Sequence, residues 1–428
     1  MSDLASIFKA YDIRGKVGTE LSEDLVERVG QSFAQWLPAE GPVVVGHDMR
    51  PDSRQLADAL ARGVTMTGRD VVDIGMVTSD MAVFGVRHFQ AAGAAIITAS
   101  HNPGEYNGIK LFDNTPKTIG LDQGLDTVRD GALSQDRPAP VAPTGNVTHK
   151  DLVDAWVEYC LGFVDTSTFK PVKIAVDCGN GMAGVVLEKL LPRLPFAVER
   201  LFFEPDGTFP NHEANPLLEE NREDITAEVI RQKADIGIAW DGDADRCFFI
   251  DGSGEFIAGD FITALLAEAA LMKQPGSTII YDVRASYAVK DTVARYNGRA
   301  LMNRVGHAFI KRRMREEDGL FGGEVTGHYY FKDNFYADNG FIPALLILEL
   351  MSRKGKSLRD LLAPLREKYF ISGEINTKVA SMDLIDGRLK ALADKYADAH
   401  TYTVDAVSYT HLRAHETDSY LVCRLLLE

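Results

Sequence analysis

The sequence predicts an α/β protein built from three related units. Short β-branched runs alternate with segments of helical period along most of the 428 residues, a pattern typical of parallel sheets with helices on their faces. Three runs end in an aspartate followed by a turn, at Asp48, Asp177 and Asp282. A polar loop that contains glycine follows each one, and these loops begin near Ser100, Asp241 and Glu324. Because α/β chains are often self-similar, the repeat is a hypothesis from spacing alone.

Composition divides the chain into four regions. The expected strands include the runs 43–45, 95–97, 174–176, 236–238 and 278–280. A proline-rich stretch at 136–145 is predicted to be a linker, and a turn at 251–254 closes the second unit. The predicted regions are 1–145, 150–251, 252–365 and 366–428.

Charge and cysteine content argue against several classes of protein. The 62 acidic and 46 basic residues give a formal net charge of −16, so we expect no nucleic-acid or membrane partner. No apolar run approaches the ~18 residues of a membrane helix, and no secretory signal is expected at the start. The four cysteines lie far apart, which favours a reducing cytoplasm over a disulfide framework or a zinc site.

The first candidate motif is Thr98-Ala99-Ser100-His101-Asn102-Pro103, directly after the expected strand at 94–97. Ligands of open α/β sheets bind at the carboxyl ends of strands. Ser100 is therefore a candidate nucleophile, which would need a base or a metal for activation. An ordinary turn, in which serine and asparagine bond their own backbone, is the alternative.

The second motif is an aspartate loop with Asp241, Asp243 and Asp245 in alternate positions. Three carboxylates at this spacing can converge on one hard cation, and a tight loop with few protein ligands favours Mg²⁺. An EF-hand is excluded because Arg246 and Gly252 stand where that loop needs glycine and glutamate. A solvated acidic turn is the alternative.

The third motif is the glycine-rich stretch 322–328. Its glycines suit close approach of the backbone to a polar ligand. In an extended segment, Glu324 and Thr326 would point to the same side and could bind two neighbouring hydroxyls. A purely structural glycine-rich turn explains the same residues equally well.

The segment Gly179–Gly184 matches the GxGxxG pattern of dinucleotide-binding proteins, with Glu199 about twenty residues further on. An NAD-dependent oxidoreductase would leave the serine and aspartate loops without a role. We therefore interpret this segment as a tight turn between a strand and a helix.

Together these motifs resemble the α-D-phosphohexomutase family, and most closely its bacterial phosphomannomutase branch. The resemblance covers residues 1 to about 365 and rests on segments in the expected order: KAYDIRG (9–15), TASHNP (98–103), NGIK (107–110), WDGDADR (240–246), VGHAFIK (305–311), GEVTGH (323–328) and ADNG (337–340). It implies three similar α/β/α domains in tandem, followed by a C-terminal α+β domain that is truncated here.

The resemblance also implies a phosphohexomutase, an isomerase that transfers a phosphoryl group within its substrate. A phosphoserine at Ser100 would interconvert mannose 6-phosphate and mannose 1-phosphate through a hexose 1,6-bisphosphate, which also serves as activator. The glucose phosphates are a further candidate pair, and the products would feed nucleotide-sugar biosynthesis. A monomer or small homo-oligomer is expected.

The same resemblance assigns roles to individual residues. The catalytic group comprises Ser100, His101, Lys110 and Arg14, with Arg14 and Lys110 as acid and base. The Mg²⁺ ligands would be Ser100, Asp241, Asp243 and Asp245. The substrate-binding group comprises Tyr11, Arg14, Arg246, Arg284, His307, Glu324, Thr326 and His328.

The chain departs from the family pattern in three places. Residues 366–428 contain no Arg-x-Ser-Gly-Thr-Glu-Pro loop, which in the family binds the non-transferring phosphate. The departure begins soon after Ala406, and 408–428 is interpreted as a tail foreign to the gene, with a native C-terminal helix as the alternative. Arg284 replaces a lysine that is frequent in relatives.

Two other functions therefore stay open. A catalytically impaired sugar-phosphate binder would explain the missing loop. Phosphoglucosamine mutase shares the fold, but its sugar loop usually reads Glu-Gln-Ser where this chain has Glu324-Val325-Thr326.

Overall fold

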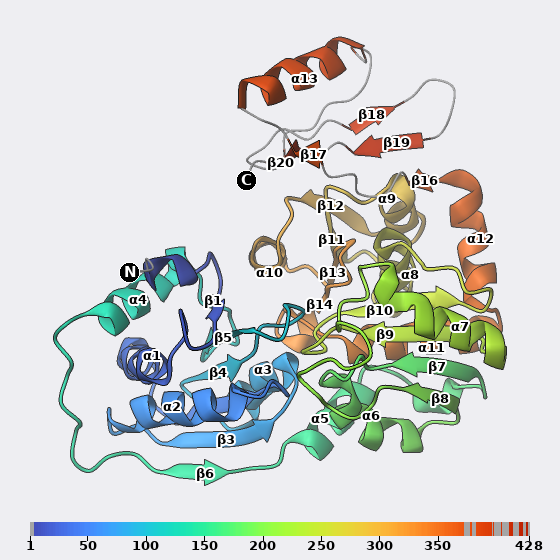
Figure 1. The fold of residues 1–428 in the computed structure, drawn as a ribbon. Coiled ribbons are helices and arrows are strands. Elements are labelled where there is room, and N and C mark those ends of the chain that lie inside the picture. The colour runs from blue at the N-terminus through green and yellow to red at the C-terminus, as the bar shows by residue number, and fades with distance from the viewer. Residues whose placement is uncertain are drawn as a thin grey trace. The chain divides into compact units, whose positions relative to one another are not determined.

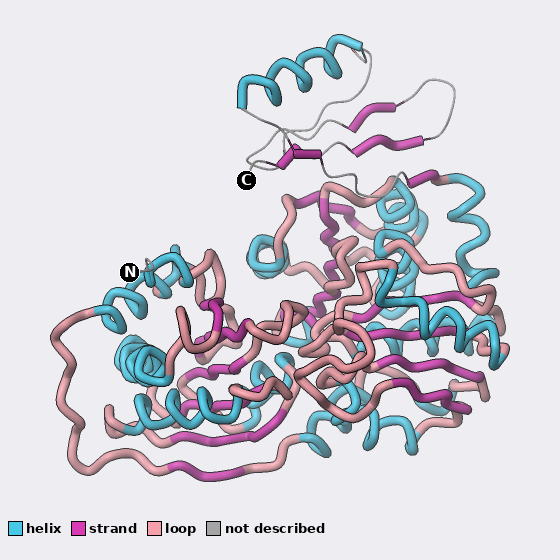
Figure 2. Tube along the Cα trace, viewed as in Figure 1, coloured by secondary structure: helices cyan, strands magenta, loops and turns pink. Residues whose placement is uncertain are grey.

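The structure is a computed structural model that describes residues 4–371, 377–378, 382–395, 397, 404, 411–413, 419–422 and 425–426. Strands and helices alternate along most of the chain, as Figures 1 and 2 show. Two compact units are present, one of residues 1–256 with 333–354 and the other of residues 257–332 with 355–428. Among the described residues, no helix has the length and apolar character needed to cross a membrane.

The first unit begins with a six-stranded mixed sheet. Its strands, in spatial order, are β1 (Ile13–Lys16), β5 (Tyr106–Asp113), β4 (Gly93–Ile97), β2 (Val43–His47), β3 (Val71–Met76) and β6 (Val147–His149). Four helices accompany it: α1 (Glu23–Trp36), α2 (Ser53–Thr65), α3 (Ser79–His88) and α4 (Leu125–Leu133). Val43 and Val45 pack in the core with α1 and α2, whereas Val44 lies against Gly85 of α3. Because both faces of β2 are covered, the strand is apolar without alternation.

A second, four-stranded sheet of the first unit has the order β10 (Cys247–Asp251), β9 (Ile236–Trp240), β7 (Lys173–Asp177) and β8 (Ala197–Leu201). Its helices are α5 (Val153–Leu161), α6 (Ala183–Leu190), α7 (Glu223–Gln232) and α11 (Phe341–Lys354). Ile225 and Val229 of α7 pack on one face of the sheet. The Trp240 indole donates to the Gly340 carbonyl (2.8 Å) just before α11. β15 (Ala337–Asp338) also belongs to this unit and contacts α3.

The second unit contains strands in the order β12 (Arg299–Asn303), β11 (Thr278–Asp282), β13 (Phe321–Gly323) and β14 (Tyr329–Phe331). Its helices are α8 (Gly259–Lys273), α9 (Tyr287–Arg295), α10 (His307–Glu316) and α12 (Leu358–Lys368). Short 3₁₀ helices occur in both units: Leu4–Ile7, Leu121–Gln123, Thr166–Thr168, Leu191–Arg193, Glu220–Arg222 and Lys332–Asn334.

The C-terminal part of the second unit is described only in pieces. These are β16 (Phe370–Ile371), β17 (Thr377–Lys378), α13 (Met382–Lys395), β18 (His411–Arg413), β19 (Ser419–Val422) and β20 (Leu425–Leu426). β16 pairs in parallel with β19, and β18 pairs antiparallel with β19. Within the predicted foreign tail, residues 408–410, 414–418, 423–424 and 427–428 lie outside the described residues. That this tail is foreign to the gene stays a prediction.

The three aspartates of the sequence repeat occupy equivalent positions in the fold. Asp177 and Asp282 end the central strands β7 and β11, and Asp48 directly follows β2. Each accepts a bond on Oδ1 from the backbone N–H two residues further on, from Arg50 (3.0 Å), Gly179 (2.8 Å) and Arg284 (2.7 Å). The same turn at the same strand end supports the interpretation of three related units.

The prediction of parallel sheets is correct for the central strands but wrong at one edge of each sheet. β4 pairs antiparallel with β5, β9 with β10 and β13 with β14. The connections 98–105, 241–246 and 324–328 are too short for a crossover helix, so each must be a hairpin. All three candidate loops are therefore hairpin turns that follow a central strand.

Helices α1 and α2 approach so closely that a side chain is excluded at the contact. A Cβ atom added to Gly63 would clash with the Glu27 carbonyl. We expect Gly63→Ala to lower the free energy of unfolding by about 1–3 kcal/mol, the usual cost of overpacking. Urea unfolding measures this, with Gly387→Ala as the control, because Gly387 is an exposed helical glycine with open space around it. Equal stability of both variants would contradict the prediction.

Candidate active site

Ser100 lies in the hairpin turn that follows β4, with an unusual backbone conformation. Its φ is +51°, which is uncommon for a residue other than glycine. The Ser100 N–H donates to Thr98 Oγ1 (2.9 Å), and the Asn102 N–H donates to the Ala99 carbonyl (3.0 Å). Ser100 is buried. These bonds hold the turn that orients the serine hydroxyl.

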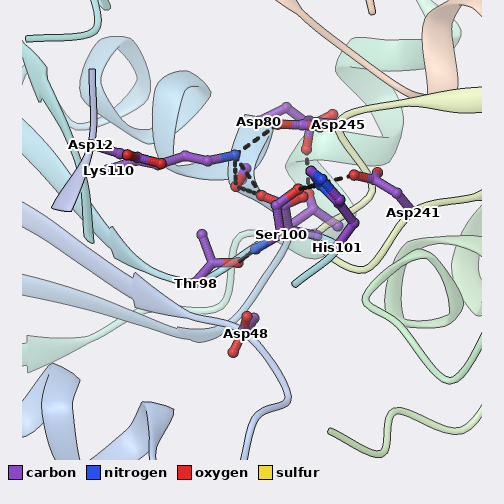
Figure 3. Close-up of polar contacts among 12 residues, drawn as sticks. Asp12, Asp48, Asp80, Thr98, Ser100, His101, Lys110, Asp241 and Asp245 are labelled. Carbon is purple, nitrogen blue, oxygen red and sulfur yellow. Dashed lines mark hydrogen bonds and ion pairs between the residues drawn. The ribbon is translucent and has the colours of Figure 1, made fainter. Parts of the chain in front are cut away.

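The hydroxyl of Ser100 faces the aspartate loop. Its Oγ lies 3.1 Å from Asp241 Oδ2 and 3.1 Å from His101 Nδ1. Figure 3 shows His101 and Asp241 beside the Ser100 side chain. A hydroxyl beside a carboxylate and an imidazole has the partners that activate a nucleophile.

The aspartate loop collects three buried carboxylates. Oxygens of Asp241, Asp243 and Asp245 all lie within 4.8 Å of one another. Basic side chains neutralise them: Lys110 Nζ lies 2.6 Å from Asp243 Oδ2 and 2.8 Å from Asp245 Oδ2, and Arg246 Nη2 lies 2.7 Å from Asp241 Oδ2. Such crowding of negative charge is costly unless cations are present.

A divalent cation fits this donor set. Asp243 Oδ2 accepts from Ser79 Oγ (2.5 Å) and from Lys110, whereas the buried Oδ1 has no hydrogen-bond partner among the described residues. Buried polar atoms without a partner are rare and call for an explanation, such as an ion. Carboxylate oxygens are the ligands that Mg²⁺ prefers. The alternative of a solvated acidic turn is wrong, because all three aspartates are buried.

The pKa values of these groups differ sharply. Burial raises the pKa of Asp241 to about 7, although Arg246 opposes the shift. Burial also acts on Asp243, but the Lys110 ammonium outweighs it and lowers the pKa of that carboxyl well below its usual range. Conversely, burial disfavours the charged form of Lys110, but Asp243 and Asp245 raise its pKa well above the usual value. The lysine is therefore held as an ammonium ion.

Arg14 and Lys110 approach the serine loop from paired strands. β1 and β5 are antiparallel neighbours, with Arg14 opposite Gly108. Arg14 Nη1 donates to Asn102 Oδ1 (2.7 Å), and its Nη2 donates to Asp12 Oδ2 (2.6 Å). The structure thus gathers these predicted residues in the first unit: Ser100, His101, Lys110, Arg14, Asp241, Asp243, Asp245 and Arg246. Tyr11, half-buried, lies in the bend before β1.

The other predicted residues, Arg284, His307, Glu324, Thr326 and His328, lie in the second unit. Glu324 is buried, accepts a bond from the Tyr330 hydroxyl, and has Oε2 3.8 Å from Arg284 Nη2. Burial raises the pKa of Glu324. The rings of His307 and His328 have centroids 6.2 Å apart.

The segment that holds Glu324 and Thr326 is a turn and not an extended strand, so the condition for a shared face is not met. The Gly327 N–H donates to the Glu324 carbonyl (3.2 Å), and the Glu324 N–H donates to the His328 carbonyl (2.9 Å). The segment reverses direction because it joins the antiparallel strands β13 and β14. The side-chain alternation of an extended chain therefore does not apply to Glu324 and Thr326.

The segment Gly179–Gly184 contains the tight turn between β7 and α6 and the first residues of that helix, which agrees with its interpretation from the sequence. A Cβ atom on Gly181 would lie 2.8 Å from the Gly242 carbonyl oxygen of the aspartate loop, and one on Gly184 would clash with the Phe203 carbonyl. These glycines allow close packing of protein backbone.

Several residues around the site were not predicted from the sequence. Ser79, at the start of α3, donates to Asp243 through its hydroxyl, and its N–H donates to the Asp243 carbonyl (3.2 Å). Asp80 is buried beside it, and burial raises its pKa well above the usual value. The position of Thr78-Ser79-Asp80 after β3, at the carboxyl edge of the sheet, is the signal that could have identified them.

Models of one known family match the three repeated α/β segments that the sequence predicts. Residues 5–134 match "Phosphoglucomutase/phosphomannomutase, alpha/beta/alpha domain I", residues 152–254 match domain II, and residues 258–369 match domain III. Relatives include the "Phosphohexose mutases" of Xanthomonas campestris pv. campestris (strain B100), 47% identical over 373 residues, which are 87% of this chain and 83% of that one. A "Phosphomannomutase" of Escherichia coli is 42% identical over 408 residues, 94% of this chain and 89% of that one.

A solved structure supports the same assignment. The phosphoglucomutase/phosphomannomutase family protein of Burkholderia thailandensis aligns with a TM-score of 0.82 and 31% sequence identity. The alignment covers 96% of this chain and 89% of that one.

His212 lies in the connection that follows β8, and this connection contacts the aspartate loop. His212 Nε2 lies 3.1 Å from Asp177 Oδ2, and the nearby Ala214 carbonyl accepts from the Gly242 N–H (3.0 Å). Burial lowers the pKa of His212, but the hydrogen bond and the negative charge of Asp177, together with the Glu213 carbonyl and Asp224, outweigh burial, so the net shift is upward.

A raised pKa makes this histidine stabilise the fold at low pH. The stabilisation is complete below the ordinary histidine pKa of about 6.5 and is lost as pH rises through the higher folded value. We expect wild type to lose on the order of 1 kcal/mol over this range, the size of one hydrogen bond. His212→Gln should remove that loss in urea unfolding from pH 5 to 9. The exposed His149→Gln is the control, and a slope unchanged in His212→Gln would refute the prediction.

Proposed function

Because the chain belongs to the phosphoglucomutase/phosphomannomutase family, we propose that it is a phosphomannomutase that interconverts mannose 6-phosphate and mannose 1-phosphate. The family makes it an isomerase, a phosphohexomutase that acts as an intramolecular phosphotransferase. Relatives 42–43% identical that are named phosphomannomutase support mannose phosphates as substrates. Glucose phosphates are a second candidate pair.

The observation that carries this proposal is the placement of the Ser100 hydroxyl beside the charged aspartate loop. Ser100 Oγ lies 3.1 Å from Asp241 Oδ2, and Arg246 and Lys110 bring cationic groups to the same loop. Phosphoryl transfer depends on positioning and on neutralising charge at the phosphoryl oxygens. A serine nucleophile among fixed cations meets both requirements.

The proposed reaction has two transfers. In the first, the bond between phosphorus and Ser100 Oγ breaks as a bond forms to a hydroxyl oxygen of the hexose monophosphate, whose proton passes to a base of the site. The product is a hexose 1,6-bisphosphate, which also serves as activator. In the second, Ser100 Oγ takes the other phosphoryl group, and the sugar oxygen that leaves receives a proton.

Lys110 and Arg14 are the proposed acid and base. The carboxylates of Asp243 and Asp245 keep Lys110 protonated, so this state of the site holds a proton donor for the leaving sugar oxygen. Arg14 binds the serine loop through Asn102 and lies on the strand next to that of Lys110. His101 and Arg246 are proposed to stabilise the phosphoryl group.

Mg²⁺ is the proposed metal, with Ser100, Asp241, Asp243 and Asp245 as ligands. Support comes from the three buried carboxylates and from Asp243 Oδ1, which has no hydrogen-bond partner within the described part of the chain. When bound, the cation would neutralise charge on the transferring phosphoryl group.

Recognition of the sugar phosphate is proposed for a group that includes Arg14 and Arg246 a second time: Tyr11, Arg14, Arg246, Arg284, His307, Glu324, Thr326 and His328. Glu324 is the buried acceptor of this group, and Tyr330 and Arg284 fix its carboxylate.

The proposed domains are 1–145, 150–251, 252–365 and an incomplete 366–428. We further propose a cytoplasmic enzyme, a monomer or small homo-oligomer, that takes a hexose phosphate as its partner.

A sugar-phosphate binder with impaired catalysis is the second candidate. It is favoured by one observation, the lack of the phosphate-binding loop in 366–428. Remote phosphate contacts help to hold a substrate in attack geometry. Phosphorylation of Ser100 without isomerisation of either sugar phosphate would distinguish this function from a mutase.

Ser100→Ala should abolish turnover, because no other group would carry the phosphoryl. Peptide mass spectrometry after incubation with glucose 1,6-bisphosphate and Mg²⁺ should find a phosphoryl group on Ser100 of the wild type. A coupled assay with mannose 1-phosphate should show no isomerisation by the variant. The exposed Ser167→Ala is the control and should behave as wild type. Normal turnover by Ser100→Ala would disprove the phosphoserine mechanism.

Asp243→Asn should weaken binding of divalent cations by at least about 10-fold, because ligand and supporting residues typically contribute that much. Titration calorimetry with Mg²⁺, and Mn²⁺ electron paramagnetic resonance, measure the affinity without any turnover. Asp126→Asn, at an exposed position on α4, is the matched control. Equal affinity in both variants would exclude Asp243 as a ligand.

A further inference from the structure

Arg50 uses every donor of its guanidinium on the loop that carries Ser100 and on one anchoring carboxylate. We propose that Arg50 is the positioning residue of this loop, which fixes the Ser100 hydroxyl against Asp241. The inference rests on the proposed phosphoserine function. No motif of the sequence pointed to Arg50, which lies in the turn after β2.

The contacts of Arg50 are almost all with backbone carbonyls. Nη1 donates to Pro103 (2.8 Å) and Tyr106 (2.9 Å), and Nη2 donates to Ser100 (2.9 Å) and Asn102 (2.6 Å). Nε donates to Asp48 Oδ2 (3.2 Å). An arginine has five N–H donors in a rigid fork, and all five are used here. Because Arg50 as a whole residue is only 3% exposed, water does not compete for these bonds.

Asp48 ties this guanidinium to the sheet. Its N–H donates to the Ile97 carbonyl (2.9 Å) at the end of β4, directly before the serine loop. Its Oδ1 also accepts from Ser53 Oγ (2.5 Å), which in turn accepts from Asn107 Nδ2 (2.9 Å). The carboxylate and the guanidinium thus connect β2, α2 and both ends of the hairpin turn.

The serine loop needs such support because of its backbone conformation. Ser100 has φ +51°, and a residue other than glycine keeps this conformation only where its surroundings determine it. The Ser100 carbonyl accepts from Arg50 and abuts the aspartate loop, where a Cβ atom on Gly242 would clash with it. A shift of this carbonyl would therefore move Ser100 relative to Asp241.

The hydrogen bonds of Arg50 are those of a residue that positions the serine loop and takes no part in the chemical steps. Arg50 binds the carbonyl of Ser100, and its five N–H groups all donate to atoms other than the serine hydroxyl. Loss of Arg50 should thus slow phosphoryl transfer and leave sugar-phosphate affinity nearly unchanged. Lysine cannot replace it, because an ammonium has three donors where five are used.

The first test measures phosphoryl transfer from phosphorylated full-length chain to mannose 1-phosphate by rapid quench. Arg50→Lys should lower the transfer rate about 100-fold, as expected for a misplaced reacting group, with KM within about two-fold of wild type. Arg62→Lys is the control, because the Arg62 side chain pairs with Glu23 and Glu27 of α1, and none of its bonds in the described part of the chain reaches the serine loop. A transfer rate in Arg50→Lys equal to that of the control would overturn the proposal.

The second test does not depend on turnover. Hydrogen–deuterium exchange of the peptide 98–106 should accelerate in Arg50→Lys and stay at the wild-type rate in Arg62→Lys. Unchanged exchange would overturn the proposal even if activity fell. If Arg50→Lys does not fold, Asp48→Asn keeps the arginine without its charged anchor and should show a smaller change in the same direction; wild-type exchange in that variant would overturn the proposal.

The two hypotheses can fail separately. Wild-type chain that never carries a phosphoryl group on Ser100 would refute the proposed function, while the exchange measurement would still decide whether Arg50 holds the loop. A phosphorylated wild type with normal transfer in Arg50→Lys would refute only the role of Arg50.

Discussion

The buried charge cluster around Asp243 is the constraint on which the first unit depends. Three carboxylates without water are stable only if cationic groups and hydrogen-bond donors surround them. Lys110 of β5, Arg246 of the aspartate loop and Ser79 of α3 supply those groups. Each element must therefore be correctly placed before the cluster can form, and loss of one partner would destabilise the fold and disturb the site together.

Much of this arrangement can be read from the sequence. The repeat of Asp48, Asp177 and Asp282 predicted three related units, because an aspartate that ends a strand and binds the backbone of a turn is a local feature. The serine and aspartate loops were also predicted, because their residues are contiguous and chemically distinctive. These features depend on a few neighbouring residues, and one sequence is enough to recognise them.

Features that depend on contacts distant in the sequence were missed. Arg50 and Ser79 each looked like part of an ordinary turn or helix start, and their roles follow from contacts with Ser100 and Asp243. The antiparallel edge strands were missed for a similar reason. An apolar run does not reveal whether its strand pairs parallel or antiparallel, and only the short connection to the next strand determines this. The turn at Glu324 and Thr326 follows from the same hairpin constraint.

The hairpin placement of the three loops has a consequence for how such a protein can evolve. A loop at the tip of an edge hairpin can be lengthened, shortened or exchanged without altering the helical crossovers that build the core. After duplication of one ancestral unit, each copy could thus diversify its tip independently. The first tip now carries Ser100, the second the three aspartates and the third Glu324, while all three units keep the same aspartate at the strand end.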